Sequence, residues 1–274
     1  IHKVGDVLVN NTDNLILSAM VGLISVGCYS NYYLIIASVH SIMTRMFQGL
    51  TASVGNLGVT QGKERIRKVF ASSFFVGQWM YGFAAICLYE LINLFVEFSF
   101  GAEYVFPENV VFVLCLNFFI LGMRQAALVF RDSLGLFWFA RYKSIANALL
   151  NIVFSIVLAK ECGAFGVFLG TLFSTLLTSF WVEPLVLYRH SLKVPVVHYF
   201  AKYALYTGIV LAAGVLTHVL CRQMEGSMAA VFVKRMCVCV AVPNVIFLVC
   251  YVRTKEFRFL WEKIMSVVKK RRKM

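Results

Sequence analysis

The residues best placed to do chemistry in this chain are polar or small side chains that recur inside strongly apolar segments. Within residues 27–58 they follow one another at steps of three, four or seven, which places them on one face of a helix. This face consists of Asn31, Ser38, Ser41, Arg45, Gln48, Ala52 and Gly55, with Leu34 completing it. Amide and hydroxyl groups around a mid-depth guanidinium predict an aqueous pathway rather than contact with lipid.

Three further segments carry polar residues at helical spacing. Asn117, Arg124 and Arg131 are seven residues apart, and a second face is formed by Ser144, Asn147, Asn151 and Ser155. Near the start of the chain, Asn10, Asn11, Asp13 and Asn14 cluster within one turn, with Ser18 a turn later. Four helices with polar faces predict one shared cavity. Its expected lining is Arg45, Arg124, Asn31, Ser41, Gln48, Asn117, Asn147 and Asn151.

The expected chemistry of this cavity is anion binding. A guanidinium stays protonated when buried and presents a fork that matches phosphate or carboxylate oxygens. Arg45 and Arg124 are therefore predicted to contact an anionic ligand. The alternative for each is a pair with a carboxylate such as Asp13, or a bond to a backbone carbonyl. Asp13 is a candidate site for a coupling ion or proton, the alternative being a counter-ion to one of the arginines.

Other polar and small residues have structural interpretations. Arg131-Asp132 is expected to be structural at a helix end, and Glu183-Pro184 to mark a kink or a contact with the lipid interface. Gly163, Gly166 and Gly170 predict close helix packing. No spacing typical of a nucleophile, a phosphate loop, paired catalytic carboxylates or metal ligands occurs. The sequence therefore predicts no enzyme activity, no metal and no cofactor.

The elements that must position these residues are membrane-spanning helices. Of the 274 residues, 60% are hydrophobic and 14% charged, whereas soluble domains have about 25% charged residues. The mean hydropathy is +0.79. Apolar runs of about 20 residues predict an all-α bundle of eight spans, at 5–23, 27–58, 69–96, 107–130, 142–160, 164–188, 198–221 and 229–252. The second span is long and is expected to tilt, kink or project from the membrane.

The positions of the cations predict an orientation. With the amino terminus in the cytoplasm, inner segments hold 20 Lys and Arg and outer loops hold four, as the positive-inside rule requires. Both termini are then cytoplasmic, and the net charge of +13 reflects topology rather than nucleic-acid binding. Residues 255–274 predict a basic amphipathic helix whose Lys269, Lys270, Arg271, Arg272 and Lys273 attract anionic lipids; the alternative is a flank that only fixes topology.

Several segments resemble a known transporter family. The carrying sequences are NTDNLILS (11–18), VGCYSNY (26–32), TASVGNL (51–57), Met123-Arg124, RDSLGLF (131–137), Asn151-Ile152 with Ser155, GVFLGT (166–171) and VEPLVLY (182–188). Over about residues 1–190 they resemble, in order, the carboxyl-terminal half of bacterial polysaccharide flippases of the Wzx type. These belong to the multidrug/oligosaccharidyl-lipid/polysaccharide exporter superfamily. The last two spans resemble the family only in hydropathy.

This resemblance implies a fold and a function. Residues 1–190 would form the second six-helix lobe and residues 191–254 two accessory helices; the first lobe would be missing, so that the chain is a fragment. The implied activity is transport of undecaprenyl-diphosphate-linked oligosaccharides across the bacterial cytoplasmic membrane, with membrane lipids, polysaccharide polymerase and export proteins as partners. The alternatives are a lipid II flippase, a cation-coupled drug exporter, a membrane-embedded glycosyltransferase-type enzyme, or a non-transporting scaffold from a split gene.

Overall fold

The computed structural model describes residues 12–60 and 62–271, and within them the chain is helical with no β-strand. This confirms the all-α class. The elements are η1 (Leu17–Val21), α2 (Leu23–Gln48), α3 (Thr51–Thr60), α4 (Lys63–Phe100), η2 (Ala102–Tyr104), α5 (Glu108–Met123), α6 (Gln125–Ser133), η3 (Leu136–Ala140), α7 (Lys143–Leu177), α8 (Ser179–Leu187), η4 (Tyr188–Leu192), α9 (Val197–Arg222), α10 (Met228–Tyr251) and α11 (Lys255–Arg271).

Five stretches of the described chain are long and apolar enough to cross a membrane. They are Lys63–Phe100, Glu108–Ser133, Leu136–Leu192, Val197–Arg222 and Met228–Tyr251. The third has 57 residues and reverses direction at Gly163, which has φ 59° and ψ −136°. It therefore contains two arms, residues 143–162 and 164–177, of which the second continues into α8. Membrane-crossing helices are thus supported, while the count of eight spans stays a prediction.

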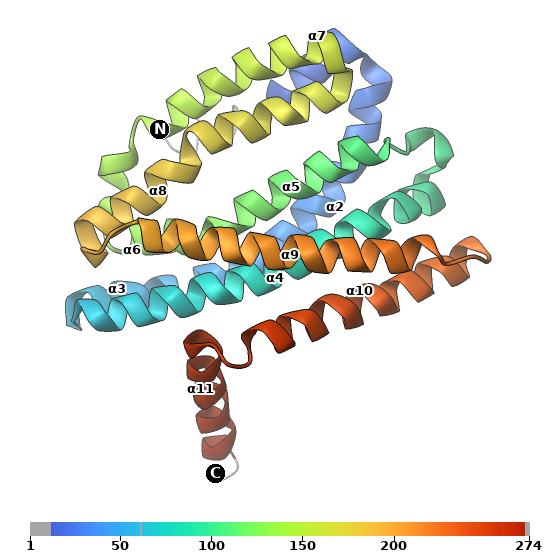
Figure 1. The fold of residues 1–274 in the computed structure, drawn as a ribbon. Coiled ribbons are helices and arrows are strands. Elements are labelled where there is room, and N and C mark those ends of the chain that lie inside the picture. Colours follow the sequence, from blue (N-terminus) through green and yellow to red (C-terminus); the bar gives the residue numbers. More distant parts are fainter. Residues whose placement is uncertain (1–11, 61, 272–274) are drawn as a thin grey trace.

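The helices run side by side in alternating directions, and α4 lies at the centre (Figure 1). α4 packs against α5, α9 and α10, and also contacts α2 and α11. With 38 residues and a rise of about 1.5 Å per residue, it is longer than the ~30 Å hydrocarbon core of a bilayer. Aromatic rings hold α9 against it, with Phe74 4.8 Å from Tyr199 and 5.6 Å from Tyr206 between ring centroids.

The basic turns gather at one end of this bundle. The start of α4, the turn before α7, the turn before α9 and the start of α11 share that end. The segment between α4 and α5, the reversal within α7 and the turn between α9 and α10 lie at the other end (Figure 1). Contacts tie the basic end together: Arg67 donates to the carbonyl of Leu192, at 2.9 and 2.6 Å, and Lys202 pairs with Glu256. Alternation of the helices therefore places these basic turns at one end of the bundle, and the orientation in a membrane stays a prediction.

Two predicted spans are broken. The span 27–58 ends its helix at Gln48, and Gly49 and Leu50 form a turn before α3 begins. Ala52 and Gly55 consequently lie on α3 and do not extend the polar face of α2. The span 107–130 is interrupted at Arg124, between α5 and α6. The first seven residues of the first predicted span, 5–11, lie outside the described residues.

The glycines of the sixth span serve two purposes. A Cβ at Gly166 would lie 2.1 Å from the carbonyl oxygen of Leu158, and one at Gly170 would lie 2.4 Å from the hydroxyl of Ser155. These contacts confirm the predicted close packing, here between the two arms of α7. Gly163 is different, because its positive φ makes the turn between the arms.

Candidate functional site

The polar face of α2 is open. Ser38, Ser41, Arg45 and Gln48 are exposed, and Asn31 is partly exposed. The opposite face packs on the bundle: Phe47 is buried, and the hydroxyl of Tyr32 donates to the side-chain oxygen of Asn93 on α4. α2 thus has an apolar side that contacts α4 and a side that the other described helices leave uncovered. The uncovered side carries these polar residues together with the exposed Leu34, Ile42 and Met46.

Arg45 is the cation on this open face. In the part of the chain that the structure describes, no carboxylate lies within ion-pair distance of its guanidinium. Its charge is therefore not neutralised by a partner in these residues, and its fork of donors remains available to an anion.

Arg124 has a different environment. Its side chain is buried, and its Nε and Nη2 donate to the two carboxylate oxygens of Glu183, each at 2.8 Å. Lys143 donates to the same carboxylate, and Nη1 of Arg131 lies 3.7 Å from it. The Glu183 cluster, defined as Arg124, Arg131, Lys143, Glu183 and Asp132, therefore joins α6, α7 and α8.

The electrostatics of this cluster are those of a buried clamp. Glu183 is fully buried, and three cations surround it, while Asp132 pairs with Arg131 at 2.7 Å. A carboxylate taken out of water needs such partners, since a buried unpaired charge is strongly destabilising. Glu183-Pro184 was expected to mark a kink or a contact with the lipid interface. The lipid contact is wrong, because Glu183 is buried among cations. Its place within an apolar segment was the signal that it must have a cationic partner.

Asp13 forms a second buried polar group. It is 4% exposed, accepts a hydrogen bond from the hydroxyl of Thr171 at 3.1 Å, and no Lys or Arg of the described chain pairs with it. The side-chain amide of Asn151 donates to the same hydroxyl at 2.9 Å. The amide oxygens of Asn14 and Asn151 are buried without a hydrogen-bond partner among the described residues. Carboxylate, hydroxyl and amide oxygens at one site are the ligands that hard cations prefer.

The predicted asparagines of the other faces bond to neighbouring helices. Asn117 on α5 donates to the carbonyl of Phe168 at 2.9 Å, and the side-chain oxygen of Asn147 accepts from Thr178 at 2.9 Å. Asn151 links the two arms of α7 through Thr171. These polar groups therefore form hydrogen bonds between neighbouring helix segments inside the bundle. The structure does not place them on the open face of α2.

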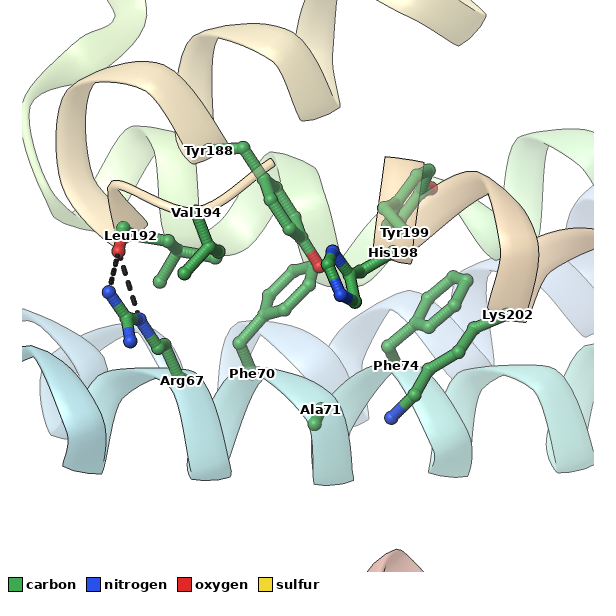
Figure 2. A pocket seen from close by; sticks show the side chains of 10 residues that line it. All are labelled: Arg67, Phe70, Ala71, Phe74, Tyr188, Leu192, Val194, His198, Tyr199 and Lys202. Atoms are coloured by element: carbon green, nitrogen blue, oxygen red, sulfur yellow. Dashed lines mark hydrogen bonds between the residues drawn. The ribbon is translucent and has the colours of Figure 1, made fainter. Parts of the chain in front are cut away.

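Two apolar grooves flank the basic half of α4. The groove in Figure 2 has a volume of about 240 Å³, with Phe70, Ala71 and Phe74 of α4 facing Tyr188 and Tyr199, and with Arg67 and Lys202 at its two ends. The second lies between α2, α4 and α11 and has a volume of about 290 Å³. Neither is lined by Arg45 or Arg124.

The basic tail is only partly described. Lys269, Lys270 and Arg271 belong to α11, whose backbone is helical there, and nothing is described of their side chains. Arg272 and Lys273 lie outside the described residues. The predicted membrane-surface role of these five residues therefore stays a prediction.

The fold defines an all-α bundle with several helices able to cross a membrane. No protein-family model, curated protein or solved structure matches the chain.

Proposed function

We propose that this chain is the second half of a membrane transporter that moves an anionic, lipid-linked oligosaccharide across the bacterial cytoplasmic membrane. The observation that carries the proposal is the open face of α2 with Arg45, which has no ion-pair partner among residues 12–60 and 62–271. The resemblance of residues 1–190 to polysaccharide flippases supplies the substrate class, an undecaprenyl-diphosphate-linked glycan.

α2 is not among the five described stretches that are apolar enough to span a membrane by themselves, so within a membrane its polar face has to be covered by protein or water. Placing one arginine at the centre of a bilayer costs roughly 2.5–3.5 kcal/mol on insertion scales, and Ser38, Ser41 and Gln48 add to the cost of contact with acyl chains. A second lobe facing α2 would enclose this face in a hydrated cavity. Such a cavity shelters a charged, sugar-bearing head while the polyprenyl tail stays in the lipid.

The residues of the open face have distinct roles in this proposal. Arg45 binds the diphosphate, because its guanidinium matches phosphate oxygens. Asn31, Ser41 and Gln48 bind sugar hydroxyls. Arg124, Asn117, Asn147 and Asn151 bond inside the lobe and keep its helices together. A lobe that moves as one body is what a rocking transition between inward-open and outward-open states requires.

Asp13 is the proposed coupling site of this transporter. Its buried carboxylate, the hydroxyl of Thr171 and the unpartnered amide oxygen of Asn151 provide oxygen ligands for a monovalent cation. Binding there joins the amino-terminal segment to both arms of α7. Cation binding therefore stabilises one packing of these helices over another, which is how an ion gradient can drive a conformational change.

The orientation belongs to the same proposal. The end that carries the basic turns faces the cytoplasm, and both termini lie there, in keeping with the positive-inside rule. Partners in glycan assembly, such as a polymerase, would meet the transporter at the opposite side, where the transported glycan emerges.

Transport of a labelled polyprenyl-diphosphate oligosaccharide in proteoliposomes tests the proposal. The protein is the complete gene product that contains this chain, and lipid II serves as the competing substrate. Arg45→Ala should abolish transport, whereas Arg65→Ala, which removes an exposed arginine at the basic end, should transport normally. Equal transport by both variants removes Arg45 from substrate binding.

A further inference from the structure

The groove between α2, α4 and α11 has no role in the proposed transport. It has a volume of about 290 Å³, and its walls include Phe47, Leu50, Val76, Met80 and Leu260. Two serines of α4 also reach it, but each hydroxyl donates to the carbonyl four residues earlier in its own helix, at 2.9 Å. The interior of the groove is therefore apolar in character.

One cation stands at the rim of this groove. Lys263 of α11 is exposed, forms no ion pair with the described residues, and holds its ammonium 5.1 Å from the centroid of the Phe259 ring. An apolar interior with an unpaired ammonium at its rim is complementary to a molecule with an apolar chain and an anionic head.

The placement of α11 indicates where such a molecule would come from. α11 turns away from α10 and projects from the bundle, roughly perpendicular to the long helices (Figure 1). Phe257 stacks on Trp79 of α4, with 6.3 Å between the centroids, and Glu256 pairs with Lys202 of α9. In a membrane that the long helices cross, an amphipathic helix oriented in this way would lie in the plane of the membrane surface.

The charge of this end favours anionic lipids. Residues 253–271 contain seven Lys and Arg and two Glu. A basic excess of this size concentrates anionic phospholipids near the helix, so that an anionic headgroup is the one that Lys263 meets most often.

We propose that the groove between α2, α4 and α11 holds one acyl chain of an anionic membrane phospholipid, whose phosphate is bound by Lys263. The proposal rests on insertion of the bundle in a membrane and not on transport. The lipid fills the space beneath α11 and fastens this helix to α2 and α4. It is a tightly bound structural lipid and not the transported substrate.

Lipid titration of the detergent-purified chain, followed by native mass spectrometry, tests this site without any transport substrate. Wild-type protein should retain one phosphatidylglycerol in preference to phosphatidylcholine. Lys263→Gln should weaken phosphatidylglycerol binding by about fivefold, the effect of one cation at a lipid headgroup. Lys255→Gln is the matched control, since it removes an exposed cation of the same helix that does not line the groove, and it should change binding less than twofold.

Filling the groove with a larger side chain tests whether the groove binds an acyl chain. Val76→Phe should lower phosphatidylglycerol retention while leaving every charge in place, and Leu50→Phe serves the same purpose should Val76→Phe fail to elute as a monodisperse species. Equal weakening by Lys263→Gln and Lys255→Gln overturns the proposal, because it indicates attraction to the surface as a whole. Undiminished retention in the filled variants, or equal retention of phosphatidylcholine, overturns it too.

Discussion

Replacing Glu183 with alanine should destabilise the bundle more than the loss of any exposed carboxylate. The substitution leaves the guanidinium of Arg124, which now makes two bonds of 2.8 Å, and the ammonium of Lys143 without their shared partner. Removing one member of a buried ion pair costs about 3–5 kcal/mol. By the scaling of larger domains, that lowers Tm by roughly 10 °C.

Thermal unfolding of the purified protein in detergent measures this loss. The matched control is Glu161→Ala, which removes an exposed carboxylate from the same pair of arms and should change stability by about 0.5 kcal/mol or less. Glu183→Gln should also lower Tm. Adding Lys143→Met to it should restore part of that loss of Tm, because Lys143 then no longer places a charge beside the missing carboxylate. Equal Tm values for Glu183→Ala and Glu161→Ala would refute the assignment of the cluster as a clamp.

Two further predictions concern other parts of the lobe. Gly170→Ala should lower the free energy of unfolding by about 1–3 kcal/mol, because its Cβ would lie 2.4 Å from the hydroxyl of Ser155. Gly208→Ala is the control and should be neutral or stabilising, because the space around its Cβ is open. Thermal unfolding in detergent measures both variants, and equal effects would contradict the close packing of the two arms of α7. Sodium at about 100 times its Kd should stabilise the wild-type protein by ~2.7 kcal/mol relative to a choline buffer. Asp13→Asn should abolish this stabilisation, whereas the control Asp132→Asn should retain it. Unchanged sodium dependence in Asp13→Asn would exclude Asp13 as a sodium ligand.

Hydropathy predicted most helices of this bundle within a few residues. The runs 198–221 and 229–252 correspond to α9 and α10, and the reversal near Gly163 separates two predicted spans. A kink was one of the expectations for the span 27–58, but its place at Gly49 was not predicted, and neither was the break at Arg124. A hydropathy window averages over about 20 residues, whereas a helix break depends on the backbone conformation of one or two of them.

The direction of a polar face could not be predicted from its spacing. The faces of α2 and of the first arm of α7 have the same periodicity, but Arg45 is exposed whereas Asn151 bonds within the lobe. Spacing places residues on one face; tertiary packing decides whether that face meets water or another helix. The partners of Glu183 are 40 and 59 residues away along the chain, a separation at which one sequence carries no pairing signal.

Labelling of single cysteines on α2 with a membrane-impermeant maleimide tests most directly whether this helix presents a hydrated face. In a background in which the eight native cysteines are replaced, Ser41→Cys should react, and the neighbouring Ile42→Cys, an exposed apolar position, should not. This difference is expected for the complete gene product in the membrane. Two results would contradict a hydrated face restricted to the polar side of α2. One is equal labelling of Ser41→Cys and Ile42→Cys, and the other is that neither cysteine is labelled.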